Sequence, residues 1–316
     1  MADPAANLRI SRAVFTGAGG LIERLASRVQ APLTRFAPAP TGALHLGHVV
    51  NAIFVWGVAR ALGGQVLLRI EDHDRQRSRP AYERALLDDL DWLGFVPDIF
   101  PTRAFRAGAC DGRQSDRDPV YREALEPLIA SGRVYACDCT RQQTVAPVYS
   151  GRCRDRGLPL GDGLGWRIRL DDTRETFDDG LLGPHAQTPA DQCGDLLIRD
   201  RVGNWTYQWA ATTDDTRHQI TLIVRGDDLL DSTGRQLQLA RLLGRREPPV
   251  FVHHPLVMKS TTQKLSKSDR DTGIADLRGA GWSAARVIGH AAALLGLQAT
   301  AQPIDAVDVA ERLSMT

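Results

Sequence analysis

The 316-residue sequence has no apolar run that approaches the length needed to cross a membrane. Its first 33 residues include Asp3 and lack the apolar core of a secretory signal peptide. We therefore expect a cytoplasmic protein with no membrane partner. Residues 1–33 are interpreted as an N-terminal extension, which is either a variable segment or the product of an upstream start codon. Within it, residues 21–29 have the pattern of a short amphipathic helix.

The sequence also lacks an excess of charge of either sign. The formal net charge is +1, from 39 basic and 38 acidic residues. This balance excludes a protein drawn to nucleic acid by its overall charge, although a local basic face is still compatible with it. A hydrophobic content of 43% and a charged content of 24% are ordinary for a soluble globular enzyme.

The sequence also lacks an even number of cysteines. Five cysteines without an export signal argue against a disulfide framework and for thiols or metal ligands. Cys137, Cys139 and Cys153 fall within one short segment, which favours a metal site over three unrelated thiols. Cys110 and Cys193 lie outside this segment and are interpreted as plain thiols.

Residues 35–51, RFAPAPTGALHLGHVVN, predict a strand, a tight turn and a helix. Prolines and a glycine punctuate the turn, and apolar residues recur with helical spacing from 46 to 62. The turn brings His45 and His48 to the first turn of the helix, where N–H groups and the helix dipole favour a phosphate. Taken alone, the pair is equally compatible with a metal pair or with ordinary polar residues.

A second strand is predicted at residues 65–70, which makes a parallel crossover unit with the first strand and helix. Glu71 and Asp72 follow at the carboxyl end of this strand, the edge at which open α/β sheets bind ligands. We expect Glu71 to face the same crevice as His45 and His48. The alternative for both acids is capping of the next helix.

The remaining elements alternate in the manner of an α/β protein. Helices are predicted at residues 80–93, 121–131, 232–243 and 282–295. Strands are predicted at 166–170, 195–200, 220–225 and 250–257, and residues 96–118 read as a loop.

Two motifs, HLGH at 45–48 and KLSKS at 264–268, resemble the two ATP-binding signatures of class I aminoacyl-tRNA synthetases. The flanking runs RFAPAPTG (35–42), LRIED (68–72) and IVRGDD (223–228) are similar to those of the glutamyl subgroup. The resemblance covers roughly residues 34–297. It implies an α/β fold, a Rossmann-type class I catalytic domain with an inserted zinc-containing subdomain. We place the two catalytic halves at 34–132 and 201–258, the insertion at 133–200, and the KLSKS loop with a short helical segment at 259–316.

The resemblance also assigns roles to residues. It implies an ATP site, with Mg²⁺ accompanying the nucleotide, formed by His45, Gly47, His48, Lys264, Ser266 and Lys267. His45, His48 and Lys267 would neutralise charge on the phosphates during catalysis. It implies a glutamate site formed by Arg35, Phe36, Ala37, Pro38, Ala39, Glu71, Tyr207 and Arg225.

The chemistry of these side chains suits glutamate. Arg35 and Arg225 can hold carboxylates with forked donors, and Glu71 can pair with the ammonium. The alternatives are a surface salt bridge for Arg35 and a core aromatic for Tyr207. At position 39 the family usually has serine, and the alanine here removes one hydrogen bond, on the order of 1 kcal/mol.

Few residues follow the KLSKS motif, and no anticodon-binding domain is expected there. Such a chain resembles the glutamyl-queuosine tRNA(Asp) synthetases, whose zinc-site pattern matches Cys137, Cys139, Tyr149 and Cys153. This resemblance implies activation of L-glutamate without tRNA, then transfer to the queuosine in the anticodon arm of tRNA(Asp). It also implies one structural Zn²⁺, and we expect a monomer.

Two alternatives remain open. One is a truncated glutamyl-tRNA synthetase that charges tRNA(Glu). The other is a non-catalytic synthetase-like regulator that binds an amino acid or a nucleotide.

Overall fold

The computed structural model describes residues 8–13, 20–144, 148–265 and 272–315. Ser266 and Lys267, both predicted to bind ATP, lie outside the described residues. Among the helices that the structure describes, none has the length and apolarity to cross a membrane.

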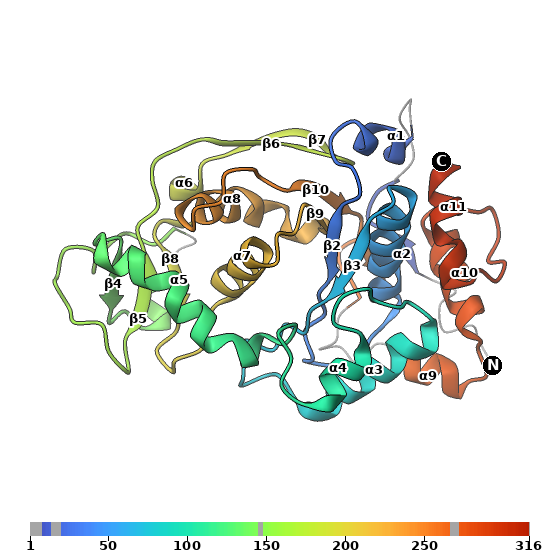
Figure 1. Cartoon of the computed structure of the whole chain (residues 1–316), viewed down its shortest axis with the longest axis horizontal. Coiled ribbons are helices and arrows are strands. Elements are labelled where there is room, and N and C mark those ends of the chain that lie inside the picture. The colour runs from blue at the N-terminus through green and yellow to red at the C-terminus, as the bar shows by residue number, and fades with distance from the viewer. Residues whose placement is uncertain (1–7, 14–19, 145–147, 266–271, 316) are drawn as a thin grey trace.

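Two pairs of parallel strands form the centre of the molecule (Figure 1). Strand β2 (Leu33–Phe36) pairs with β3 (Gln65–Leu68), and β9 (Leu222–Gly226) pairs with β10 (Val250–His254). The two pairs adjoin, because the Thr221 N–H donates to the Leu33 carbonyl at 2.9 Å. The predicted parallel α/β organisation is therefore confirmed.

Helix α2 (Leu46–Ala61) connects β2 to β3 and is apolar on almost every side. A helix of this kind has to be covered all round. The sheet lies on one side of it, and helices α10 (Ala284–Leu294) and α11 (Val309–Ser314) cover the other (Figure 1). The contact is close, since a Cβ added at Gly57 would lie 2.1 Å from a Leu313 methyl carbon.

Part of the expected N-terminal extension belongs to the folded core. Helix α1 (Leu21–Ala26) buries Leu21 and Leu25 in the main hydrophobic cluster. Strand β1 (Arg9–Ile10) pairs antiparallel with β11 (Val257–Met258). These two elements of the segment interpreted as an extension therefore pack against the rest of the fold.

A second sheet contains Cys137 and consists of β4 (Val134–Cys137), β5 (Gly165–Ile168) and β8 (Leu196–Arg199). All of its pairings are antiparallel, and α5 (Asp118–Ala130) lies beside it (Figure 1). Between β5 and β8 the chain leaves this sheet as the β6–β7 hairpin (Glu175–Asp179 and Gly183–Gln187). The hairpin pairs with β10, so the stretch predicted as an insertion contributes two strands to the catalytic sheet.

The loop expected at residues 96–118 contains a helix, α4 (Thr102–Ala107), and the short 3₁₀ helix η1 (Gln114–Arg117). Arg113 holds this segment through ion pairs with Glu83 and Asp116. The pair with Glu83 joins residues 30 positions apart and leaves no periodic signal in the sequence, which is why the segment was predicted as a loop.

The remaining elements complete the covering of the sheets. They are α3 (Pro80–Leu93), α6 (Pro189–Cys193), α7 (Tyr207–Arg217), α8 (Thr233–Leu242), α9 (Ile274–Gly279), and the 3₁₀ helices η2 (Arg141–Thr144), η3 (Asp227–Ser232) and η5 (Ala306–Asp308).

If α1 is part of the core, Leu25→Ala should lower the free energy of unfolding by about 2–4 kcal/mol, the usual cost of a cavity at a buried leucine. The exposed Glu23→Ala on the same helix is the matched control and should change it by less than about 0.5 kcal/mol. Denaturant unfolding at pH 7 measures both. Equal, small effects would show that α1 is dispensable for stability.

Candidate active site

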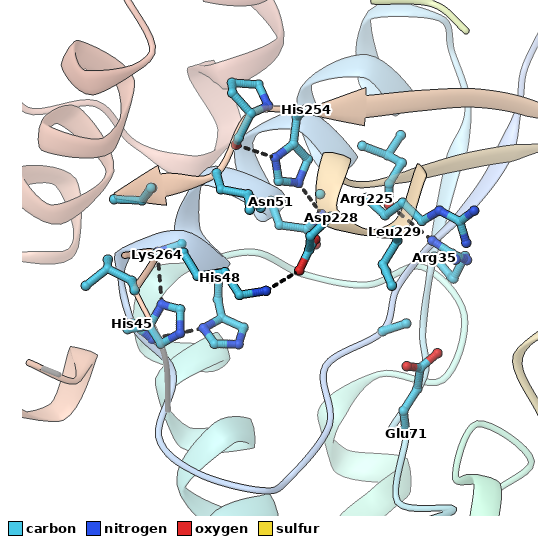
Figure 2. Close-up of a pocket in the computed structure, with 18 of the residues that line it drawn as sticks. Arg35, His45, His48, Asn51, Glu71, Arg225, Asp228, Leu229, His254 and Lys264 are labelled. Carbon is cyan, nitrogen blue, oxygen red and sulfur yellow. Dashed lines mark hydrogen bonds and ion pairs between the residues drawn. The ribbon is translucent and has the colours of Figure 1, made fainter. Parts of the chain in front are cut away.

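A cavity of about 340 Å³ opens at the carboxyl ends of β2 and β9, where polar side chains from distant segments meet (Figure 2). The structure brings most of the predicted site residues to it: Arg35, Ala37, His45, Gly47, His48, Glu71, Tyr207, Arg225 and Lys264 line the cavity. The crossover topology explains this meeting, because the carboxyl ends of parallel strands share one edge.

The two histidines cap helix α2 in a reciprocal arrangement. The Nδ1 atom of His45 accepts from the Gly47 N–H at 3.1 Å, and the Nδ1 atom of His48 accepts from the His45 N–H at 3.1 Å. Backbone N–H groups can only donate, so both Nδ1 atoms act as acceptors. While these bonds hold, the ring proton of each histidine sits on Nε2.

This cap changes the expected means of holding a phosphate. The Gly47 N–H is taken by the His45 ring and does not point freely out of the helix. The helix end therefore presents imidazole Nε2–H donors, and the two ring centroids lie 4.1 Å apart. Gly47 is required for the packing, because a Cβ there would lie 2.9 Å from Cε1 of His45.

Arg225 is a buried cation with neutral partners. Its Nε donates to Nε2 of His253 at 3.0 Å, and its two Nη atoms donate to Gln236 and Thr233 at 2.5 and 2.9 Å. Only 4% of its surface is exposed, and within the described residues no carboxylate forms an ion pair with it. Burial lowers the pKa of Arg225; the charge of Arg35 adds to this effect, and Tyr207 and Asp215 only partly oppose it.

Arg35 is also buried, but it has a counter-ion. Its Nε donates to Asp215 at 3.1 Å, and Arg69 donates to the same carboxylate oxygen at 2.5 Å. Burial alone would raise the pKa of Asp215, but the charges of Arg35 and Arg69 hold it at about 2. Arg69 also pairs with Glu71 at 2.8 Å, so an ion-pair network joins β2, the segment after β3, and α7. The surface salt bridge considered for Arg35 is thus a buried one.

Three residues predicted from the resemblance lie elsewhere. Phe36 packs in the core, with its ring 5.2 Å from that of Trp56. Pro38 and Ala39 belong to the turn and are not among the residues that line the cavity. Pro38 supports the site through its backbone, since its carbonyl accepts the Glu71 N–H at 3.1 Å.

The cavity also has lining residues that the sequence reasoning missed, notably Asn51, Asp228 and His254. Asp228 forms an ion pair with Lys264, and His254 accepts from Asn51 at 2.9 Å while its Nδ1 faces the Pro255 carbonyl. Asp228 follows the strand predicted at 220–225, which was a signal available in the sequence, whereas His254 lies within the strand predicted at 250–257 and at the end of the observed β10. Burial lowers the pKa of His254 to about 4.

The predicted thiol cluster is present in the second sheet. The sulfur atoms of Cys137, Cys139 and Cys153 all lie within 4.8 Å of one another, and all three residues are buried. The Tyr149 hydroxyl lies 3.5 Å from the Cys137 sulfur. Burial would raise the pKa of Cys137, but hydrogen bonds, led by that of Tyr149, hold it at about 7. Three thiols and a phenol in this arrangement can hold a metal ion. Cys110 and Cys193 are free thiols outside the cluster.

Comparison with known proteins gives consistent matches. Residues 32–146 and 163–304 match the family model described as "tRNA synthetases class I (E and Q), catalytic domain". A glutamyl-Q tRNA(Asp) synthetase of Symbiobacterium thermophilum is 39% identical over 85% of this chain and 88% of its own length. One of Burkholderia cenocepacia is 38% identical over 87% and 91%.

Solved structures show the same fold. A glutamate tRNA ligase of Elizabethkingia meningosepticum, crystallised with its amino acid, superposes with a TM-score of 0.73 at 24% identity. The match covers 89% of this chain but 64% of that protein, less than two thirds of its length. A methionyl-tRNA synthetase of Mycobacterium tuberculosis bound by methionyl-adenylate matches at a TM-score of 0.52 and 14% identity.

The depressed pKa of His254 predicts a pH effect on stability. The folded protein takes up this proton only near pH 4, whereas the unfolded chain takes it up near 6.5. The stabilisation is therefore complete above pH 6.5 and declines as the pH falls toward 4. Between pH 7 and pH 5 the wild type should lose about 2 kcal/mol more unfolding free energy than His254→Gln, which keeps an acceptor for Asn51 but does not titrate. Denaturant unfolding at the two pH values checks this, and parallel pH profiles would contradict it.

Proposed function

The chain belongs to the class I tRNA synthetases of the glutamyl and glutaminyl type, and we propose that it activates L-glutamate with ATP, without tRNA, and transfers it to the queuosine base in the anticodon of tRNA(Asp). We propose queuosine in tRNA(Asp) as the acceptor because the glutamyl-Q tRNA(Asp) synthetases named above are 38–39% identical to this chain over most of its length. ATP, L-glutamate and the anticodon arm of tRNA(Asp) are the proposed partners.

The observation that carries the proposal is the unpaired charge of Arg225. A buried guanidinium without a carboxylate is costly, and a carboxylate ligand removes that cost. Arg225 lines the cavity, so a carboxylate of glutamate bound there would supply the missing counter-ion. The forked geometry of arginine matches the two oxygens of a carboxylate.

The other groups of glutamate have partners in the same cavity. Glu71 lines it and can receive the ammonium group, because among the described residues only one of its two oxygens is engaged, by Arg69. Arg35 and the Tyr207 hydroxyl would complete the contacts to the carboxylates, because both residues line the cavity. Glutamate in this arrangement would meet positive charge at one end of the site and negative charge at the other.

ATP is assigned to the opposite side of the cavity, at the start of α2. The Nε2–H groups of His45 and His48 would donate to phosphate oxygens, helped by the dipole of a 16-residue helix. Lys264 lines the same side and is paired with Asp228. Ser266 and Lys267 remain predicted ATP contacts, and Mg²⁺ is expected to arrive with the nucleotide.

The reaction would proceed in two displacements. The α-carboxylate of glutamate attacks the α-phosphorus of ATP, an oxygen–phosphorus bond forms, and pyrophosphate leaves. A hydroxyl of the cyclopentenediol of queuosine then attacks the acyl carbon of the adenylate and AMP leaves. The enzyme forms no covalent bond, so its contribution is alignment and stabilisation of the phosphate charge.

The thiol cluster is assigned to one structural Zn²⁺ held by Cys137, Cys139, Cys153 and Tyr149. Three clustered, buried thiols with a fourth oxygen donor suit the four-coordinate preference of zinc. The guanidinium of Arg167 lies 3.6 Å from the centroid of the Tyr149 ring and would stabilise negative charge on the donor set. The ion would tie the end of β4 to the segment around residue 150 and takes no part in the two displacements.

The proposed reaction predicts glutamate-dependent exchange of pyrophosphate into ATP in the absence of tRNA. With labelled glutamate, label should appear on tRNA(Asp) that carries queuosine and not on tRNA(Asp) without it. Label on tRNA(Glu) would instead establish the alternative of a glutamyl-tRNA synthetase. Absence of the exchange reaction would favour a non-catalytic binding protein.

For the metal, we expect elemental analysis of the purified protein to find about one zinc per chain. Cys137→Ser should lose most of it, because it removes one of three thiolate ligands. Cys193→Ser is the matched control, since Cys193 is a free thiol outside the cluster, and it should keep its metal. Full retention of zinc by the Cys137 variant would remove this assignment.

A further inference from the structure

We propose that His253 and Asp179, neither of which lines the cavity, form a relay that positions Arg225 to receive the carboxylate of the substrate. This inference rests on the proposed function, because it gives Arg225 the role described above. His253 and Asp179 are positioning residues here, since they act through Arg225 and do not touch the cavity.

The relay consists of two hydrogen bonds in series. The Asp179 carboxylate lies 2.7 Å from Nδ1 of His253, and Nε2 of His253 lies 3.0 Å from Nε of Arg225. The side chains of Asp179 and His253 have no exposed surface. The guanidinium of arginine can only donate, so Nε2 must accept and the ring proton must sit on Nδ1, facing Asp179. The partners of the imidazole therefore determine its tautomer.

Asp179 is itself held firmly. Its Oδ1 accepts the N–H groups of Leu181 and Leu182 at 2.9 and 3.0 Å, and its Oδ2 accepts the His253 N–H at 3.1 Å. These bonds lie at the turn between β6 and β7. The pKa of Asp179 falls below its ordinary value, because the bonds from His253 and the turn outweigh the effect of burial. A charged carboxylate thus anchors the imidazole from behind.

The register of the strand pairing brings Asp179, His253 and Arg225 together. Arg225 and His253 are direct partners in the parallel pairing of β9 and β10. On the other side of β10, Asp179 is the partner of Phe251 in the pairing of β6 with β10. The β6–β7 hairpin thereby brings Asp179 to the relay that ends at Arg225. This role would explain why the hairpin pairs with the catalytic sheet.

A comparison within the same cavity shows what the relay achieves. Asp215 contacts Arg35 and Arg69 directly and compensates their charges. For Arg225, a neutral imidazole stands between the guanidinium and the Asp179 carboxylate. Direct contact would neutralise Arg225 and weaken its attraction for a ligand. The imidazole holds the guanidinium in place and leaves its charge for the substrate.

Two substitutions of His253 each remove one of its two hydrogen bonds and keep the other. In His253→Gln, the terminal amide oxygen can take the place of Nε2 and accept from Arg225, while the bond to Asp179 is lost. In His253→Asn, the shorter amide can take the place of Nδ1 and donate to Asp179, while the bond to Arg225 is lost. Each variant therefore removes one bond of the relay from the same buried site.

Steady-state pyrophosphate exchange, with glutamate and ATP varied separately, tests the relay. His253→Asn should raise the KM for glutamate by about ten- to a hundredfold, the range for a lost hydrogen bond to a charged group. His253→Gln should raise it several times less. The KM for ATP should change little in either variant, because His45 and His48 are not in the relay. His185→Asn on β7 is the control and should leave the KM for glutamate unchanged.

The opposite order would overturn the inference. If His253 serves only to satisfy the buried Asp179, His253→Asn is the milder variant and His253→Gln the more damaging one. Equal rises in both KM values would likewise contradict positioning of Arg225. Thermal unfolding of both variants shows whether each is folded at the assay temperature. If one is not, the stabilisation of the other by glutamate is compared with that of the wild type. Much weaker stabilisation in His253→Asn, or nearly unchanged stabilisation in His253→Gln, supports the relay, and the reverse result contradicts it. Absence of exchange in the wild type would refute the proposed function, whereas a working wild type with the wrong order refutes only the relay.

Discussion

Burial of positive charge at one edge of a parallel sheet is the constraint on which this structure depends. Arg35, Arg69 and Arg225 are all at most 4% exposed, and a buried guanidinium needs a counter-charge or several acceptors. Asp215 on α7 compensates the first two, which ties that helix to the strands. Within the described part of the chain Arg225 has only neutral acceptors, and we propose that a carboxylate ligand supplies its counter-charge. The burial of positive charge that organises the fold thus also marks the proposed binding site.

The two sides of the cavity differ in how the sequence specifies them. The side proposed to bind the nucleotide is local, because His45, Gly47 and His48 form their cap within a single helical turn. A short motif is therefore enough to bring these residues together. The side proposed to bind the amino acid is assembled over long distances: Arg35 meets Asp215 and Arg225 meets His253. Such contacts follow from strand register, which a single sequence does not reveal.

The same distinction explains what else was and was not predicted. Strand–turn–helix periodicity correctly predicted β2, α2 and β3, and cysteine spacing predicted the thiol cluster. The helix within residues 96–118 is held by the ion pair between Arg113 and Glu83, and strand β1 exists through its pairing with β11. The β6–β7 hairpin was assigned to the insertion because its pairing with β10 joins residues about 70 positions apart. Each miss involves an interaction between distant segments, whereas each of these successes rests on a pattern within one short stretch of the chain.

The effect of Ala39 can be judged by comparing the free energy of one lost hydrogen bond with that of an unpaired buried charge. The hydroxyl that the family usually has at this position is worth one hydrogen bond, on the order of 1 kcal/mol. Leaving a buried charge without its partner costs more, about 3–5 kcal/mol. Ala39 does not line the cavity, whereas Arg225 does and is buried there without a carboxylate among the described residues. Recognition of a carboxylate at this site should therefore depend mainly on the charge and aim of Arg225, and the missing hydroxyl is a minor loss.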